Sequence, residues 1–264
     1  MGYEEALRLI EEAKETGGTT LGLHLQGLSK IPQEVFQLKH LVILGVGGNS
    51  LASLPSEIGQ LNTLETLWLD SNQLSSLPSE FRRLTNLRRL YLERNYFSTL
   101  PPELFALNKL IELALNDNQL TSLPPEIVQL PNLRGLMLQR NPLTTLPPEI
   151  AQLPKLRRLE LEGNPLTSPP YELAIQGIEA IREYFASAEE GTRTVAEVKV
   201  ILVGEGASGK TSLTRCLRKE RFNPHEETTH GIRIKPWQLK TGDQGLRCNL
   251  WDFGGQEIMH ATHQ

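Results

Sequence analysis

The sequence predicts an α/β chain in two parts, a solenoid of 23-residue repeats followed by a separate α/β domain that begins near residue 198. Two observations predict the solenoid: asparagines recur every 23 residues, and so do pairs of an apolar residue and proline. A third observation predicts the second domain, because a β-branched apolar run at 198–203 leads directly into a glycine-rich loop. The 264 residues have room for two ordinary domains.

The repeats keep one phase over most of the first part. The asparagines in phase are Asn49, Asn72, Asn95, Asn118, Asn141 and Asn164. The apolar–proline pairs are Ile31-Pro32, Leu54-Pro55, Leu77-Pro78, Leu100-Pro101, Leu123-Pro124 and Leu146-Pro147. Leucines hold fixed places between them, as Leu64, Leu67, Leu69 and Leu74 do around Asn72. This pattern is the leucine-rich repeat.

The repeat spacing predicts a parallel sheet on the concave side of a solenoid. In each repeat a short strand directs leucines inward and alternate residues outward, and stacking buries the leucines of neighbouring repeats. We expect the asparagine at the strand end to turn inward and satisfy backbone groups of the turn. The proline suits an extended convex segment, which needs no ladder hydrogen bond.

Both ends of the solenoid are expected to be capped. A weaker repeat with Leu21, Leu23 and Leu28 in phase begins the array, so about seven repeats are expected over residues 18–170. Residues 1–17 predict an amphipathic capping helix closed by glycine. Residues 171–197 predict a C-terminal capping helix and a linker. The apolar stripe expected on that helix is Leu173, Ile178, Ile181, Tyr184 and Phe185.

The concave face is the expected docking surface for a protein partner. Outward strand positions carry Trp68, Tyr91 and Met137, with Arg89 and Arg94 among the charged residues nearby. Aromatic and arginine side chains are common anchors of interfaces. We therefore take Trp68, Tyr91, Arg89 and Arg94 as candidate anchors; the alternative is a solvated face with scattered large side chains.

The glycine-rich loop has the sequence of a phosphate-binding loop. Residues 204–211 read Gly-Glu-Gly-Ala-Ser-Gly-Lys-Thr, which fits G-x-x-x-x-G-K-[ST]. A predicted strand precedes the loop and a helix-like segment at 212–220 follows it, which is the context that the motif requires. This order predicts a P-loop NTPase domain.

Each residue type in the loop has a chemical role. Gly204 and Gly209 allow backbone N–H groups to form a concave nest around phosphate oxygens. Lys210 neutralises the β- and γ-phosphates, and the Thr211 hydroxyl can bind magnesium. The candidate nucleotide-binding residues of the loop are Gly204, Gly206, Ala207, Ser208, Gly209, Lys210, Thr211 and Ser212.

Two downstream segments agree with a nucleotide site. A second strand, expected at 246–253, ends in Asp252-Phe253-Gly254-Gly255-Gln256. A strand-end aspartate such as Asp252 commonly holds magnesium, directly or through water. The spacing from Asp252 allows the Gly255 N–H to reach the γ-phosphate. A hydroxyl in the polar turn at 228–232, ahead of a strand at 232–239, would complete the magnesium shell.

The order of these motifs resembles the Roco family of GTPases. Leucine-rich repeats precede a Ras-like loop, then Thr-His-Gly-Ile at 229–232 and Trp-Asp-Phe-Gly-Gly-Gln-Glu at 251–257, so the resemblance covers essentially the whole chain. It implies that residues 198–264 are the N-terminal part of a Roc domain, which binds GTP and GDP with Mg²⁺. A COR domain that mediates dimerisation follows the Roc domain in that family.

The resemblance also implies roles for individual residues. Thr229 would be the switch threonine on Mg²⁺, beside Thr211 and Asp252 as the other magnesium residues. Gln256 falls at the position of the water-orienting glutamine. Gln256 and Lys210 are therefore the expected catalytic residues of a slow GTP hydrolysis to GDP and phosphate.

Composition and length constrain these expectations. A net charge of −4 gives no support for a nucleic-acid partner, and no apolar run is long enough to cross a membrane. Cys216 and Cys248 are expected to be reduced thiols of a cytoplasmic protein. The chain ends at Gln264 before any base-reading motif, so guanine specificity rests on the resemblance and the chain alone is expected to be inactive.

Two other functions remain as alternatives. The first is a repeat-only scaffold with a non-functional nucleotide loop, against which the intact Lys210, Thr211 and Asp252 argue. The second is an ATP-dependent signalling NTPase of the immune-receptor type. Those proteins usually place the repeats after the nucleotide domain, whereas here the repeats come first.

Overall fold

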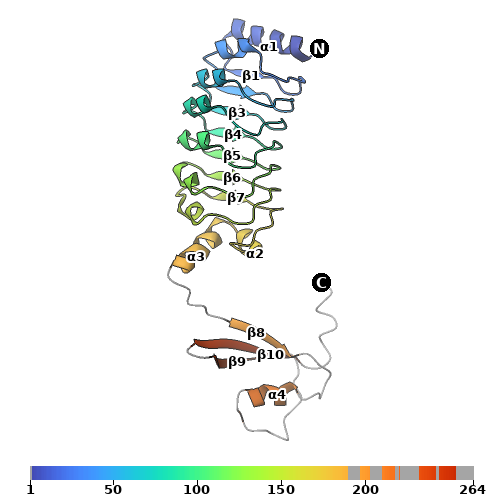
Figure 1. Cartoon of the computed structure of the whole chain (residues 1–264), viewed down its shortest axis with the longest axis vertical. Helices are drawn as coiled ribbons and strands as arrows, with labels where there is room; N and C mark the ends of the chain where they lie inside the picture. Colours follow the sequence, from blue (N-terminus) through green and yellow to red (C-terminus); the bar gives the residue numbers. More distant parts are fainter. Residues whose placement is uncertain are drawn as a thin grey trace. The chain divides into compact units, whose positions relative to one another are not determined.

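The computed structural model describes residues 2–189, 197–202, 210–217, 220, 232–241 and 244–253. The chain divides into two compact units, residues 1–190 and residues 191–264. The first unit is an array of stacked repeats with helices at its ends, and the second contains strands β8 to β10 and helix α4 (Figure 1). No helix in the described part of the chain is long and apolar enough to span a membrane.

The repeats form a seven-stranded parallel sheet in chain order, β1 to β7. Its strands are Thr20–Gly22, Ile43–Gly45, Thr66–Trp68, Arg89–Tyr91, Glu112–Ala114, Gly135–Met137 and Arg158–Glu160. Residues 23 positions apart pair across the sheet, as Leu67 does with Leu90 and Leu90 with Leu113. The solenoid with a parallel sheet predicted from the sequence is thereby confirmed.

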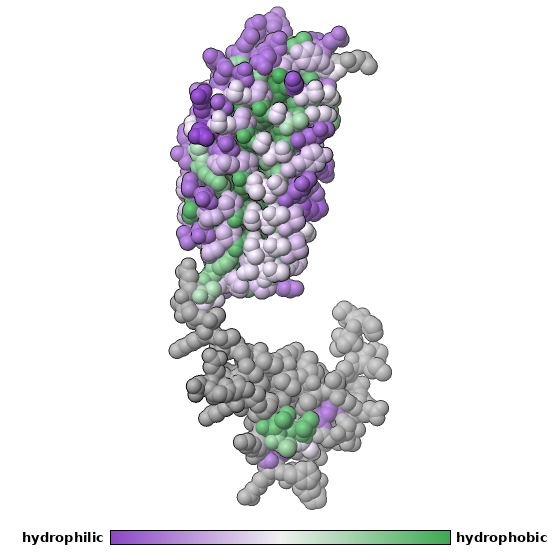
Figure 2. Space-filling model, in the orientation of Figure 1, coloured by the Kyte–Doolittle hydropathy of each residue, from purple (hydrophilic) through white to green (hydrophobic). Residues whose placement is uncertain are grey.

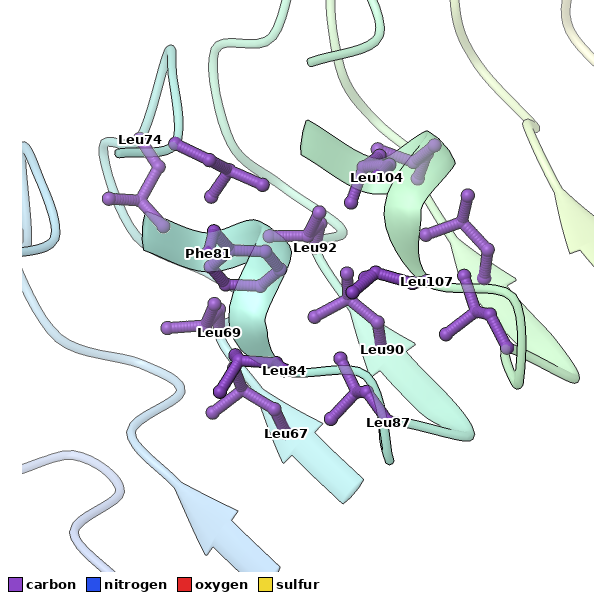
Figure 3. Packing of buried hydrophobic residues seen from close by; sticks show 14 of the residues in the cluster. Leu67, Leu69, Leu74, Phe81, Leu84, Leu87, Leu90, Leu92, Leu104 and Leu107 are labelled. Atoms are coloured by element: carbon purple, nitrogen blue, oxygen red, sulfur yellow. The ribbon is translucent and has the colours of Figure 1, made fainter. Parts of the chain in front are cut away.

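A short 3₁₀ helix on the opposite side of each of the first six repeats closes the core. These helices are Gln33–Gln37, Ser56–Gln60, Ser79–Arg83, Pro102–Ala106, Pro125–Gln129 and Pro148–Gln152. Each begins after the proline of the repeat, and Pro55 is extended with φ −75° and ψ 155°. Phe81 from one such helix packs among strand leucines such as Leu67 and Leu90, all completely buried (Figure 3). Each buried leucine contributes about 1.5–3 kcal/mol, so the stacked array is stable although one repeat is not.

Helix α1, Gly2–Thr16, covers the first strand with a narrow apolar face. Ala6, Ile10 and Ala13 are buried there, at the spacing that one face of a helix requires. Gly17 adopts φ +65°, and the Gly18 N–H donates to the Ala13 carbonyl at 3.0 Å, which ends the helix in a Schellman motif.

The C-terminal end of the array is covered by two helices, whereas the sequence predicted one helical stretch. Helix α2 spans Tyr171–Ala174 and helix α3 spans Ile178–Glu189. Gly177 between them has φ +107°, a conformation that a continuous helix does not allow. Arg182 of α3 donates to the carbonyls of Leu153 and Ala151 at 2.7 and 3.1 Å, which ties α3 to the last repeat.

The repeated asparagines join neighbouring repeats, as the sequence predicts. Asn118 is typical: its Nδ2 donates to the carbonyls of Leu92 and Leu115 at 2.9 and 3.1 Å. All six in-phase asparagines are buried. Each therefore satisfies backbone groups of its own turn and of the preceding repeat.

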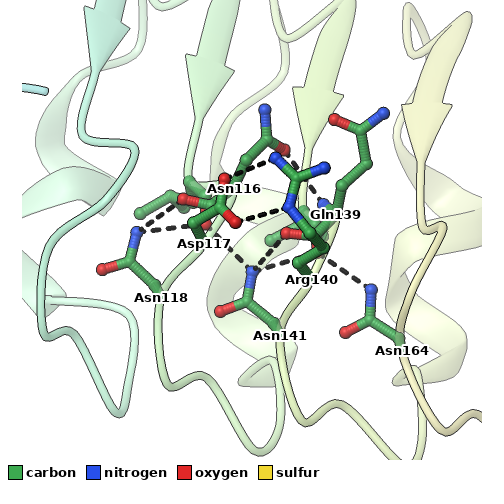
Figure 4. A network of polar contacts seen from close by, with 9 residues as sticks. Asn116, Asp117, Asn118, Gln139, Arg140, Asn141 and Asn164 are labelled. Carbon is green, nitrogen blue, oxygen red and sulfur yellow. Dashed lines mark hydrogen bonds and ion pairs between the residues drawn. The ribbon is translucent and has the colours of Figure 1, made fainter. Parts of the chain in front are cut away.

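The residue before each asparagine, and before Gln26 in the first repeat, belongs to a column with left-handed backbone. The column contains Leu25, Gly48, Ser71, Arg94, Asp117, Arg140 and Gly163, with φ between +52° and +76°. Positive φ is uncommon outside glycine. Cross-repeat hydrogen bonds hold it here, because the Arg94 N–H donates to the Asn116 carbonyl and the Asp117 N–H to the Gln139 carbonyl, both at 2.9 Å. Figure 4 shows this part of the polar network.

The second unit contains a three-stranded sheet in the order β8-β10-β9. Strand β8 spans Glu197–Leu202, β9 spans Ile232–Thr241, and β10 spans Gln244–Phe253. Helix α4, Lys210–Leu217, follows β8 and contacts β10. Strand β10 pairs parallel with β8 and antiparallel with β9.

Candidate functional site

Strand register places the ends of β8 and β10 side by side. Leu202, the last residue of β8, pairs with Asp252 near the end of β10. The glycine-rich loop follows Leu202 in the chain, and the Gly-Gly-Gln segment follows Phe253. The ends of β8 and β10, to which these two segments are joined, therefore lie at the same carboxyl edge, where open α/β sheets bind their ligands.

The third candidate segment reaches the same edge from the other direction. Because β9 runs antiparallel to β10, its first residue, Ile232, pairs with Phe253. Thr229 precedes Ile232 by three residues. The first residue of β9 and the last residues of β8 and β10 thus lie at one edge of the sheet.

Helix α4 begins with the lysine and threonine of the motif. Lys210 and Thr211 occupy its first turn, where backbone N–H groups and the helix dipole favour anions. Thr214 is buried and its Oγ1 donates to the Lys210 carbonyl at 3.0 Å, which fixes the first turn.

The described residues include only part of the predicted site. Lys210, Thr211 and Ser212 lie on α4, and Asp252 lies on β10. The predicted site residues outside the described residues are Gly204, Gly206, Ala207, Ser208, Gly209, Thr229, Gly255 and Gln256.

A second candidate site lies on the concave face of the repeats. Trp68 of β3 and Tyr91 of β4 are cross-strand partners, and their rings stack with centroids 5.5 Å apart and planes 6° apart. Both rings are half-buried. The residue that corresponds to Tyr91 two strands further on is Met137 of β6. It was expected on the open face but is only 6% exposed, since it lies within the packed surface of the sheet.

A cavity of about 500 Å³ adjoins this aromatic pair. Its lining residues are Trp68, Asp70, Ser71, Tyr91, Glu93, Arg94, Asn116, Asp117 and Arg140. Arg140 donates to Asp117 at 2.6 Å, and this pair lowers the pKa of Asp117 (Figure 4). Arg89 lies 3.8 Å from Glu112 on the same face. Two of the arginines near the cavity are therefore already engaged by carboxylates.

Glu93 differs from the paired acids because its charge is only partly compensated. Its Oε2 is buried and has no hydrogen-bond partner in the structure. Burial raises the pKa of Glu93, and the carboxylates of Asp70 and Glu112 raise it further, while a hydrogen bond from its own backbone N–H and the charge of Arg94 oppose them. The concave face thus holds a carboxylate that a cation would stabilise.

Asp70 and Glu93 were not among the residues singled out from the sequence. Both could have been found by strand alternation, because each stands two positions after an aromatic residue of the concave face, Trp68 or Tyr91. In the described part of the chain, no group of three or more His, Cys, Asp and Glu side chains is arranged to hold a metal ion.

The comparison with protein families matches both units. A family described as "Ras of Complex, Roc, domain of DAPkinase" matches residues 199–264. Families described as leucine-rich repeats match residues 62–106, 85–129 and 108–166.

Relatives of known name are similar to parts of the chain. The Ras-related protein Rab-21 of Geodia cydonium is 34% identical over 76 residues, covering 29% of this chain and 33% of that protein. A Roc-COR-CHAT protease from an unknown prokaryotic organism is 33% identical over 100 residues, covering 33% of this chain and 9% of the protease. The probable serine/threonine-protein kinase pats1 of Dictyostelium discoideum is 34% identical over 108 residues, or 3% of its length. The chain thus spans a third or less of these relatives.

Solved structures resemble the repeat array. A leucine-rich repeat protein of Leptospira interrogans superposes with a TM-score of 0.51 at 37% identity, covering 60% of this chain and 46% of that one. The leucine-rich repeat domain of the type III effector XopL superposes with a TM-score of 0.57 at 33% identity, covering 61% of this chain and 58% of that one.

Proposed function

Because the chain has the Roco-type order of leucine-rich repeats followed by a Roc domain, we propose that it is part of a GTP-dependent switch. In this proposal the second unit binds GTP and GDP with Mg²⁺ and hydrolyses GTP slowly. The repeats bind a protein partner. The observation that supports the proposal is the pairing of Leu202 with Asp252 and of Ile232 with Phe253, which puts the strand ends next to the motif segments at one sheet edge.

The residues at this edge suit a nucleoside triphosphate. Gly204, Gly206, Ala207, Ser208 and Gly209 would supply backbone N–H groups to the phosphate oxygens. Lys210 would bind the β- and γ-phosphates. Ser212 follows in the first turn of α4, where a further N–H group faces the same charge.

The oxygen donors near this edge also suit Mg²⁺. Thr211 and Thr229 would offer hydroxyls and Asp252 a carboxylate, and hard oxygen donors are what Mg²⁺ prefers. When bound, the ion neutralises charge on the phosphates. Gln256 would orient the attacking water, and the Gly255 N–H would reach the γ-phosphate, so that hydrolysis changes the contacts of this segment.

The resemblance to Roco proteins suggests three further features of the whole protein. We propose that a COR domain beyond this chain makes it a dimer, and that the dimer accelerates hydrolysis. A constitutive monomer of the natural full-length protein that hydrolysed GTP as fast as the dimer would refute the acceleration. A cytoplasmic location belongs to the same proposal, because the cytoplasm supplies GTP.

The test of the switch is a titration of the natural full-length protein with fluorescent GTP, GDP and ATP. Lys210→Ala is the loss variant, and Cys216→Ser, an exposed change on the same helix, is its matched control. Guanine-nucleotide binding that only Lys210→Ala removes would support the proposal. Binding of no nucleotide by the folded protein would indicate a scaffold with a non-functional loop, and a preference for ATP would overturn the guanine assignment.

A further inference from the structure

We propose that the concave cavity beside Trp68 and Tyr91 binds an arginine side chain of the protein partner. The inference rests on the proposed partner-binding function and specifies the chemistry of that partner. It starts from three features that occur together: the stacked rings of Trp68 and Tyr91, the cavity that they line, and the incompletely compensated carboxylate of Glu93 in the same lining.

The first argument is charge. The Asp117–Arg140 pair neutralises itself at one side of the cavity, and Glu112 has Arg89 as a neighbour. Asp70 and Glu93 remain, with Arg94 as the cation that acts on Glu93. Buried charge that lacks a full set of partners is costly, and a bound cation removes part of that cost.

The second argument is the aromatic surface. Trp68 and Tyr91 are stacked nearly parallel, so each ring covers one face of the other, and the aromatic surface that a ligand can contact is an outer face and the edges of the pair. A planar guanidinium stacks on such surfaces and is more weakly hydrated than an ammonium group. It also forms two parallel hydrogen bonds to a carboxylate such as that of Asp70, while the partly buried Glu93 adds negative charge at the same cavity.

The third argument is space. A cavity of about 500 Å³ has ample room for one arginine side chain together with water. The left-handed backbone at Ser71 and Arg94 forms the rim, where cross-repeat hydrogen bonds at 2.8 and 2.9 Å hold it rigid. A rigid site loses little conformational entropy when it is filled.

The experiment selects ligands from a phage-displayed library of random linear peptides on this chain. Selected peptides are synthesised, and their affinities are measured by calorimetry. We expect the binders to share an arginine, and its replacement by neutral citrulline to weaken binding about tenfold or more. Replacing that arginine by lysine should weaken binding as well, because the planar contacts are lost.

Glu93→Gln is the decisive protein variant, because it removes the charge and keeps the shape. Its matched control is Glu162→Gln, which stands three repeats further along at the corresponding position and is exposed. Glu93→Gln should lower the affinity for arginine peptides about tenfold and leave the affinity for citrulline peptides almost unchanged. Glu162→Gln should leave both affinities unchanged.

The outcomes separate this inference from the proposed function. Peptides that lose binding in Trp68→Ala, yet show no dependence on arginine or on Glu93, would overturn the arginine site and keep partner binding on the concave face. Full retention of affinity with lysine would overturn the guanidinium assignment. If no peptide loses binding in Trp68→Ala or in Glu93→Gln, the concave cavity is not a docking site and both proposals for it are refuted.

Discussion

The backbone N–H of Phe97 donates to Asn118 Oδ1 at 3.0 Å, across the junction between two successive repeats. The two residues lie 21 positions apart in the chain, and the bond is buried. Equivalent bonds occur at Leu51, Leu74, Leu120 and Leu143. The asparagines therefore supply a buried side-chain link between repeats, in addition to the backbone hydrogen bonds that join them.

Asn118→Ala should destabilise the repeat array. The change leaves the Phe97 N–H without its side-chain partner, at a cost of about 1–3 kcal/mol. It also removes one of the two asparagine donors from each of the carbonyls of Leu92 and Leu115, which keep Asn95 and Asn141. Urea denaturation followed by circular dichroism measures the loss. Asn62→Ala, at an exposed asparagine, should change stability by less than about 0.5 kcal/mol. Equal effects of the two changes would contradict this account.

Leu90→Ala should cost about 2–5 kcal/mol, because it opens a cavity in a completely buried strand position next to Phe81 (Figure 3). Leu25→Ala is the comparison, since Leu25 is 81% exposed and should lose less than about 0.5 kcal/mol. Urea denaturation measures both changes in stability. A small loss of stability in Leu90→Ala would contradict the prediction and show that the array tolerates cavities.

Glu93→Gln should raise stability at neutral pH. Burial raises the pKa of Glu93 above its ordinary value of 4.5, so the folded state holds this proton more tightly than the unfolded state. Stability therefore decreases as pH rises from 4.5 through the pKa of Glu93 in the folded state. Above that pH range the charged carboxylate lowers the stability of the folded protein. We expect a higher Tm for the variant at about pH 7 and no difference at about pH 4. Glu162→Gln is the control, and an unchanged Tm of Glu93→Gln at neutral pH would contradict the prediction.

Removal of Mg²⁺ should weaken nucleotide binding by the full-length protein, and Thr211→Ala should reproduce much of that loss. The reason is the expected hydroxyl ligand at the start of α4. Fluorescent GTP titrations with and without a chelator test the coupling. If the chelator weakens nucleotide binding by Thr211→Ala as strongly as it weakens binding by the native protein, Thr211 is not a magnesium ligand.

Gln256→Leu should slow GTP hydrolysis about 10²-fold without weakening GTP binding, because the glutamine is expected to orient the attacking water. Single-turnover hydrolysis and nucleotide affinity, measured on the same full-length preparation, separate the two effects. A variant that loses binding and hydrolysis together would indicate a structural role for Gln256.

The repeat array could be predicted from sequence because its period fixes the register. Leu67, Leu90 and Leu113 must stack once 23 residues form one turn of the solenoid. The break at Gly177 was missed, since the apolar spacing of Ile178, Ile181 and Phe185 is equally compatible with one long helix. Local periodicity does not report where a chain reverses.

The candidate sites were predictable to different degrees. The phosphate-loop residues follow from a motif whose chemistry fixes residue type and order, and their individual roles stay predictions. The state of Glu93 was not predictable from sequence, because its burial depends on how Trp68, Tyr91 and Asp70 lie around one cavity. The left-handed column was equally hidden, since Leu25 and Arg94 have no intrinsic preference for that conformation.

The uniform asparagine bond between repeats has an evolutionary consequence. Every internal junction presents the same donors and acceptors, so a gene segment encoding one repeat can be duplicated or lost by unequal recombination without creating a mismatched join. Trp68 and Glu93 contribute only their backbone carbonyls to these links, so the side chains at such positions are free to diverge between copies. The length of the array can thus change by copy number while the side chains on its surface change by point mutation.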